Sequence, residues 1–147
     1  IPLEKELQLL HDYVELENRQ REPKFDFHFH MDPTIDPAKI KVPPLMIQPF
    51  VENAIIHGIP DIDDGAIRVS IETNNDLIRY TISDNGVGIK AGDDNKKKRF
   101  KEFKSHGGTI LRQRIELLRS LGYNVELKIS DDSPQGTIVQ INLPEQL

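Results

Sequence analysis

The hydrophobic positions of this chain follow two different periods along the sequence. In three segments, apolar residues recur every three or four positions, which is the spacing of an amphipathic helix. In five others they alternate with polar residues, as in a half-buried strand. The predicted helices are Leu3–Arg21, Pro44–Gly58 and Thr109–Leu121, and the predicted strands are Phe25–His30, Ala66–Thr73, Leu77–Ser83, Val125–Ser130 and Thr137–Leu143.

Proline and glycine support these boundaries. Pro23 should end the first helix, Pro44 and Gly58 bracket the second, and Gly122 stops the third. Helices and strand pairs occur in blocks, so we expect an α+β fold with helices on one face of a mixed sheet. The polar, glycine-containing stretch 84–108 is long for a connection, which is typical of a functional lid or of disorder.

The composition fits one globular domain. The chain has 147 residues, 37% of them hydrophobic and 29% charged. A net charge of -5 argues against nucleic-acid binding, and the lack of cysteine excludes disulfides and thiol chemistry. No apolar run is long enough to cross a bilayer, so we expect no membrane contact by these residues. The chain starts at Ile1, inside an apparent helix, and we interpret it as a piece of a longer protein.

A carboxylate follows the strand predicted at residues 77–83. Counting in twos, Asp84 continues the side of the strand that carries its isoleucines and Tyr80. A buried carboxylate needs hydrogen-bond donors, and the exocyclic amine of adenine would be one. Gly86 and Gly88 would let a ligand approach the backbone closely. A tight turn capped by Asp84 is the alternative, and the burial of Asp84 favours the ligand.

Polar residues also end the second predicted helix. Asn53 and His57 are four residues apart and should share a face. Amide and imidazole groups can coordinate a cation or contact phosphate oxygens without adding negative charge. A polar, solvated helix end explains the same spacing.

A third candidate lies before the helix predicted at Thr109. Ser105, Gly107 and Gly108 would surround free backbone N–H groups at the helix start, which bind anions. The run Lys96–Arg99 could add positive charge, although such runs are more often a solvated face. The stretch lacks the P-loop pattern.

The remaining candidates have simpler explanations. Thr137 is in phase with buried positions of the last strand, so its hydroxyl needs a ligand, a water or a backbone partner. His28 and His30 share a strand face with Asp26, a spacing that suits zinc. Without a third firm ligand, exposed strand histidines are the favoured explanation.

Taken in order, these segments resemble the Bergerat-fold ATPases, which include sensor histidine kinases, type II topoisomerases, mismatch-repair proteins and heat-shock chaperones. Residues 44–58, PLMIQPFVENAIIHG, are similar to the N-box of LytS-like sensor histidine kinases, typically Q-P-L-V-E-N-A-I-K-H-G. Asp84–Gly88 resembles the first glycine box, and Gly136–Pro144 resembles the closing G-T strand. Leu3–Arg21 is similar to the helix that joins such domains to their phosphoacceptor helices.

The resemblance implies a two-layer α/β sandwich of the Bergerat type that binds ATP and Mg²⁺. Asn53 would be the magnesium ligand, Asp84 would bind the adenine amine, and Thr137 would contact adenine through water. The residues implied in ATP binding are Asn53, His57, Gly58, Asp84, Gly86, Gly88, Ser105, Gly107, Gly108 and Thr137.

Within the family, one position favours a protein histidine kinase. Hydrolytic members carry a Glu four residues before the magnesium Asn, as the base that activates water. This chain has Pro49 there, which cannot act as a base. Two positions depart from the kinase pattern: Ile56 replaces a usual Lys, and Ser105 replaces the first glycine of the second glycine box. Both lie where phosphates should bind.

The resemblance also implies how the domains of the longer protein are organised. Residues 1–22 would end the helix that leads to a dimerisation and phosphoacceptor domain, and residues 23–147 would form the ATP-binding catalytic domain. The γ-phosphate would pass to a histidine on that other domain and then to a response regulator, so this part would not autophosphorylate alone. The full-length protein would be a homodimer, and this part would be the cytoplasmic portion of a membrane-anchored bacterial sensor.

Two other functions remain open for the same fold. A non-catalytic pseudokinase scaffold would explain the departures at Ile56 and Ser105. An anti-sigma-factor serine kinase would phosphorylate a serine on its partner, but that branch lacks a linker helix such as Leu3–Arg21.

Overall fold

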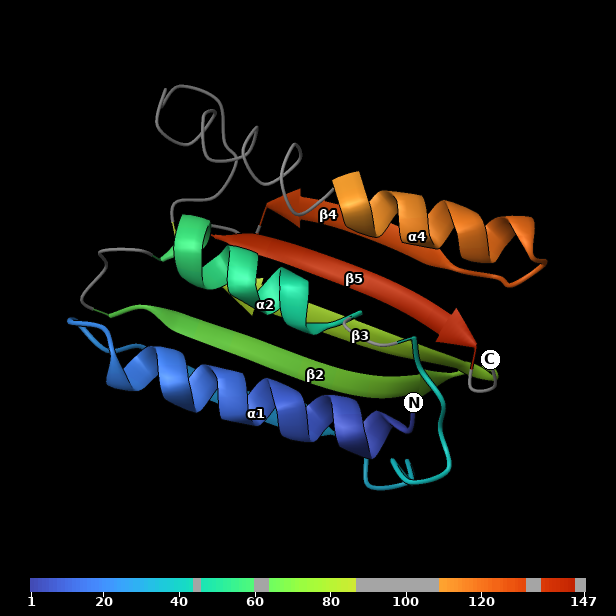
Figure 1. Cartoon of the computed structure of the whole chain (residues 1–147), viewed down its shortest axis with the longest axis horizontal. Helices are drawn as coiled ribbons and strands as arrows, with labels where there is room; N and C mark the ends of the chain where they lie inside the picture. Colours follow the sequence, from blue (N-terminus) through green and yellow to red (C-terminus); the bar gives the residue numbers. More distant parts are fainter. Residues whose placement is uncertain (44–45, 60–63, 87–108, 132–135, 145–147) are drawn as a thin grey trace.

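The computed structural model describes residues 1–43, 46–59, 64–86, 109–131 and 136–144 (Figure 1). Within these ranges the strands form a five-stranded sheet of order β1-β2-β3-β5-β4. β1 and β2 are parallel, and the other three pairs are antiparallel, so the prediction of a mixed sheet is confirmed. The strands are β1 (Asp26–Met31), β2 (Ala66–Asn74), β3 (Leu77–Asp84), β4 (Glu126–Asp131) and β5 (Thr137–Pro144).

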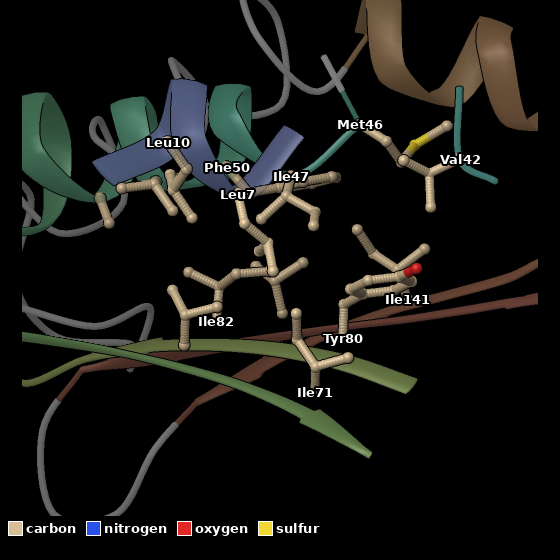
Figure 2. Packing of buried hydrophobic residues seen from close by; sticks show 14 of the residues in the cluster. Leu7, Leu10, Val42, Met46, Ile47, Phe50, Ile71, Tyr80, Ile82 and Ile141 are labelled. Atoms are coloured by element: carbon tan, nitrogen blue, oxygen red, sulfur yellow. The ribbon is translucent and has the colours of Figure 1, made fainter. Parts of the chain in front are cut away.

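The described helices cover one face of this sheet, as Figures 1 and 2 show. They are α1 (Leu3–Arg19), α2 (Gln48–Asn53), the π-helical turn η1 (Ala54–Gly58) and α4 (Thr109–Ser120). Alternate residues of β3 are buried against them, because successive strand side chains point to opposite faces. In Figure 2, Leu7 and Phe50 point down from the helices toward Ile82 and Tyr80 of the sheet. The two layers therefore share one hydrophobic core.

Helix α1 forms where the apolar spacing predicts it. Leu3, Leu7, Leu10 and Val14 are buried along one side. The helix ends at Arg19, two residues before the predicted end. The side chain of Asn18 then ties the helix to the strand that follows, since it donates to the carbonyl of Phe25 (2.8 Å) and accepts from its N–H (3.0 Å).

The second helix is shorter than predicted. Its α-helical part begins at Gln48 rather than Pro44, so Pro49 is the proline of its first turn. Proline suits that position because its missing N–H would have no partner there. After Asn53 the helix continues as the wider turn η1, closed by a bond from the N–H of Ile59 to the carbonyl of Ala54, five residues earlier (3.0 Å). Hydrophobic spacing does not distinguish such a turn from a regular helix.

The predicted hairpins are confirmed. β2 and β3 are joined at Asn75 and Asp76, whose φ angles of 49° and 66° lie in the left-handed region that Asn and Asp tolerate best. β4 and β5 pair antiparallel. In the described part of the chain, no helix combines the length and apolar character needed to cross a membrane.

Candidate nucleotide-binding site

Asp84 is a buried carboxylate at the end of β3. It is 7% exposed and continues the face that carries Ile78, Tyr80 and Ile82, which confirms its predicted strand phase. Its Oδ1 accepts the N–H of Gly86 at 2.8 Å. The turn-capping interaction that was the alternative explanation is therefore present. An ionised carboxylate can accept about four hydrogen bonds, so this bond is compatible with further donors such as an adenine amine.

Asn85 holds the turn against the neighbouring strand. Its Nδ2 donates to the carbonyl of Asp64 (2.7 Å), and its Oδ1 accepts the N–H of Ala66 (2.8 Å). Its own N–H donates to the carbonyl of Ala66 (3.2 Å). Both ends of the amide are thus engaged at the start of β2, which fixes the backbone directly after Asp84. This positioning role was not evident from the sequence, because it depends on a residue 19 positions away.

Gly136 and Thr137 lie directly against Asp84. In the pairing of β3 with β5, Thr137 is the partner of Asp84. Gly136 has a φ of 105°, and a Cβ built on it would lie 1.8 Å from the carbonyl oxygen of Asp84. Only glycine fits this position without a backbone shift. The sequence placed Gly136 at the start of the closing G-T strand but assigned a role in the site only to Thr137.

Asn53 is brought to the same end of the sheet by α2 and η1. It is 7% exposed, at the last position of α2. η1 contacts β3, and Figure 1 shows the end of this helix over the end of the sheet where β5 begins. η1, which begins directly after Asn53, thus packs against the strand that carries Asp84, and Thr137 is in register with Asp84.

The rest of the predicted site is only partly described. His57 and Gly58 belong to η1, and the side chain of His57 lies outside the described part. Residues four apart remain about one turn apart in the wider turn η1, so the expectation that His57 shares a face with Asn53 stays a prediction. Gly88, Ser105, Gly107 and Gly108 lie outside the described residues. Ile56, which departs from the kinase pattern, is half exposed.

The described site combines one buried negative charge with neutral polar groups. Within the described ranges, no group of three or more His, Cys, Asp or Glu side chains could hold a metal ion. A single amide such as that of Asn53 fits Mg²⁺, which takes few protein ligands and is completed by phosphate oxygens and water. Asp26, His28 and His30 are exposed on β1, so the zinc hypothesis gains no support.

Comparison with known proteins decides the family. The model of the histidine kinase-, DNA gyrase B- and HSP90-like ATPases matches residues 43–147. The chain belongs to this ATPase family. The sensor protein LytS of Bacillus subtilis (strain 168) is 29% identical over 99% of the chain, and LytS of Staphylococcus saprophyticus is 35% identical over 98%. The chain covers 25% and 24% of these two relatives, about a quarter of their length.

Solved histidine kinase structures share the fold. The histidine kinase domain of the blue-light activated kinase EL346 of Erythrobacter litoralis superposes with a TM-score of 0.67 at 24% identity, covering 99% of this chain and 62% of that one. The catalytic domain of histidine kinase ThkA gives a TM-score of 0.67 at 17% identity, covering 99% and 94%. The predicted α+β sandwich of the Bergerat type is therefore confirmed for this ATPase-family domain.

His11 is a packing residue of this domain. Its ring meets those of Phe27 and Phe29 edge-on, at centroid distances of 5.7 and 5.0 Å. The three rings join α1 to β1 beside a shallow groove lined also by Asn18 and Lys24. These edge-on contacts explain why the exposed side chain of His11 lies against β1.

Proposed function

We propose that this ATPase-family domain binds Mg-ATP at the end of β3 and serves as the catalytic domain of a LytS-like sensor histidine kinase. The observation that carries the proposal is the buried carboxylate of Asp84, which is paired across the sheet with Thr137 and lies on the strand that η1, the turn following Asn53, contacts. The family match supports ATP as the ligand. The resemblance of the N-box to LytS-like kinases and the LytS relatives support the kinase branch.

Each described residue has a distinct proposed role. The Asp84 carboxylate accepts the exocyclic amine of adenine, because a buried anion gains most from a donor that water cannot replace. Thr137 contacts adenine through water from the paired position on β5. The Asn53 amide oxygen is a ligand of Mg²⁺, which supplies positive charge beside the phosphates when bound. Gly86, together with Gly88 from outside the described residues, would shape the floor of the nucleotide site.

The phosphate end of the site is proposed from the sequence. His57, Gly58, Ser105, Gly107 and Gly108 are assigned to phosphate binding there, and the N–H groups preceding α4 are suited to an anion.

The position four residues before Asn53 favours phosphotransfer over hydrolysis. Pro49 lies in the first turn of α2, one helical turn from Asn53. Its ring has no group that accepts a proton from water. The neighbouring Glu52 is exposed, whereas Asn53 is buried, so the two side chains leave the helix in different directions. Within the described residues, neither Pro49 nor Glu52 is placed as a hydrolytic base, which fits transfer to a protein acceptor.

The remaining parts of the relay are proposals about a longer protein. We assign residues 1–22 to the end of a linking helix and residues 23–147 to the catalytic domain. The partners would be the protein's own dimerisation and phosphoacceptor domain, with its acceptor histidine, and a response regulator. The full-length protein would be a homodimer anchored in the bacterial membrane, with this domain in the cytoplasm.

Calorimetry of the domain with Mg-ATP tests the binding proposal. We expect micromolar-to-millimolar affinity that depends on magnesium, and no binding by a folded domain would reject ATP as the ligand. Asn53→Ala should remove most of the magnesium dependence, whereas Glu52→Gln, its exposed neighbour, should leave it unchanged. Equal behaviour of these two variants would reject the metal role of Asn53.

The phosphorylated product separates the kinase from its alternatives. The full-length protein with labelled ATP should form an acid-labile, base-stable phosphohistidine. Acid-stable phosphoserine on a partner would instead indicate an anti-sigma-factor type of serine kinase. Nucleotide binding without any transfer would indicate a scaffold, the alternative that Ile56 and Ser105 support.

A further inference from the structure

The carboxylate of Glu6 is buried inside the domain and holds the start of the helix that carries Asn53. Glu6 lies on α1 and is 1% exposed, although the other charged residues in the first turns of that helix are exposed. Its Oε1 accepts the N–H of Met46 (3.0 Å) and that of Ile47 (3.3 Å). These residues directly precede α2, and about 40 positions of sequence separate them from Glu6.

Helix α2 depends on this distant carboxylate because its own first turn lacks one. Its N-cap residue is Ile47, whose side chain cannot accept a hydrogen bond, and its first turn contains no acidic residue. Helices are ordinarily capped by a local Ser, Thr, Asp or Asn, and negative charge near the N-terminus is favourable. Here both functions come from α1. A buried carboxylate is costly unless it is hydrogen-bonded, so the geometry of Glu6 is tightly constrained.

Arg21 contacts the other end of the same helical segment. Its Nη2 donates to the carbonyl of Ile59, the residue that ends η1. Its Nε donates to the carbonyl of Pro23 (3.0 Å), and its guanidinium lies 5.2 Å from the centroid of the Phe25 ring. The side chain is therefore held from three sides. A positive charge at a helix C-terminus is favourable for the same reason as a negative charge at its start.

The middle of the two helices is packed as well. Figure 2 shows Leu7 and Leu10 of α1 next to Ile47 and Phe50, and all four side chains are buried in the same core. Partial burial and, as a smaller effect, the negative charge of Glu52 raise the pKa of Tyr13 above its usual range. Because Glu52 belongs to α2, its effect indicates that Tyr13 of α1 lies near α2. α1 thus packs against α2, and the two ends of the segment 46–59 are bound by Glu6 of α1 and by Arg21, two residues after the end of α1.

We propose that α1 and the residues directly after it set the position of Asn53 over the sheet, with Glu6 and Arg21 as the positioning residues at the two ends of the segment 46–59. Neither residue needs to touch the nucleotide. Glu6 fixes the start of α2, Arg21 fixes the end of η1, and Asn53 lies at the junction between the two helical segments. The inference rests on the proposed role of Asn53 at magnesium.

Removing the carboxylate should affect metal-bound nucleotide selectively. For Glu6→Ala we expect affinity for Mg-ATP to fall about tenfold, the equivalent of one hydrogen bond to a charged group. Affinity for ADP in excess EDTA, which depends on Asp84 and not on Asn53, should stay within about twofold. Glu6→Gln should retain part of the affinity, because its amide oxygen can still accept from Met46 and Ile47. Glu4→Gln, an exposed neighbour on the same helix, is the matched control.

Arg21, which binds the C-terminal end of the segment 46–59, is tested with a variant and a matched control. Arg21→Ala should weaken Mg-ATP binding and spare metal-free ADP. Arg19→Ala, which removes only an exposed pair with Glu15, should change neither. Parallel losses of both nucleotides in the Glu6 and Arg21 variants would overturn the proposal, as would unchanged Mg-ATP affinity. Should Glu6→Ala fail to fold, Glu6→Gln and Arg21→Ala decide the matter by the same criteria.

Amide hydrogen exchange keeps this test separate from the proposed function. In Glu6→Ala, exchange should increase at residues 46–59 while the amides of β3 stay protected. If the wild-type domain binds no Mg-ATP, the proposed function fails. Faster exchange confined to residues 46–59 in Glu6→Ala would still support the inference that Glu6 of α1 stabilises the position of this segment, whereas unchanged exchange would reject it.

Discussion

The close approach of Gly136 to Asp84 gives the sharpest test of the site's architecture. Gly136 has a φ of 105°, and an added Cβ would lie 1.8 Å from the carbonyl oxygen of Asp84 and 2.8 Å from its carbonyl carbon. Both neighbours are backbone atoms, so no side chain can rotate away. Gly136→Ala therefore has to displace the end of β3, the start of β5, or both.

Two costs add in this variant. A non-glycine residue at such a φ costs about 1–3 kcal/mol, and overpacking a buried position costs about 1–3 kcal/mol more. We therefore expect the free energy of unfolding to fall by about 2–6 kcal/mol, a large share of the 5–15 kcal/mol typical of a domain. Because the displaced atoms belong to Asp84, nucleotide affinity should fall in whatever fraction remains folded.

Gly122→Ala is the matched control for the backbone cost. Gly122 has a φ of 94°, but nothing lies within 4 Å of its added Cβ. Urea unfolding of both variants separates the two effects, since only Gly136→Ala includes the steric part. A loss in Gly136→Ala no greater than that in Gly122→Ala would refute the close approach of β5 to Asp84.

Three further predictions concern the core and the turn. Tyr80→Phe removes a hydroxyl for which the described residues offer no hydrogen-bond partner, so the free energy of unfolding should rise by about 1 kcal/mol or stay unchanged. A clear decrease in that free energy, measured by urea unfolding, would contradict this. Burial, followed by the charge of Glu6, raises the pKa of Tyr80 above the unfolded value of about 10. The folded state then keeps a proton that the unfolded state loses, so stability is complete below about pH 10 and falls at higher pH, and less steeply in Tyr80→Phe. Asn85→Ala removes two side-chain hydrogen bonds and should lower the free energy of unfolding by about 1–3 kcal/mol, whereas Asn124→Ala, at a position that is exposed like Asn85, should change it by less than about 0.5 kcal/mol in the same assay.

The local pattern was sufficient for the features that depend on periodicity. The alternation of apolar residues in β3 predicted that Asp84 would be buried, because its neighbours two and four positions earlier are core residues. Helix α1 and the two hairpins follow from the same kind of signal. The family resemblance added the roles proposed for Asn53 and Thr137, which spacing alone left open.

Features that depend on tertiary contacts were not predictable in this way. Pro44 and Pro49 both fit the first turn of a helix, and the structure uses Pro49. The hydrogen bond from the N–H of Met46 to the Glu6 carboxylate joins residues 40 positions apart. The close packing of Gly136 against Asp84 requires the observed register of β5 on β3. Such contacts arise only once the two layers are assembled.

The central claim is that the buried Asp84 carboxylate binds the amine of adenine, and inosine triphosphate tests it most directly, since it carries an oxygen in place of that amine. Calorimetry with magnesium should show that the wild-type domain prefers ATP over inosine triphosphate by at least about tenfold. Asp84→Asn offers an amide donor as well as an acceptor, so it should lose or invert this preference while retaining the fold. Equal affinity of the wild type for both nucleotides, or an unchanged preference in Asp84→Asn, would contradict the account.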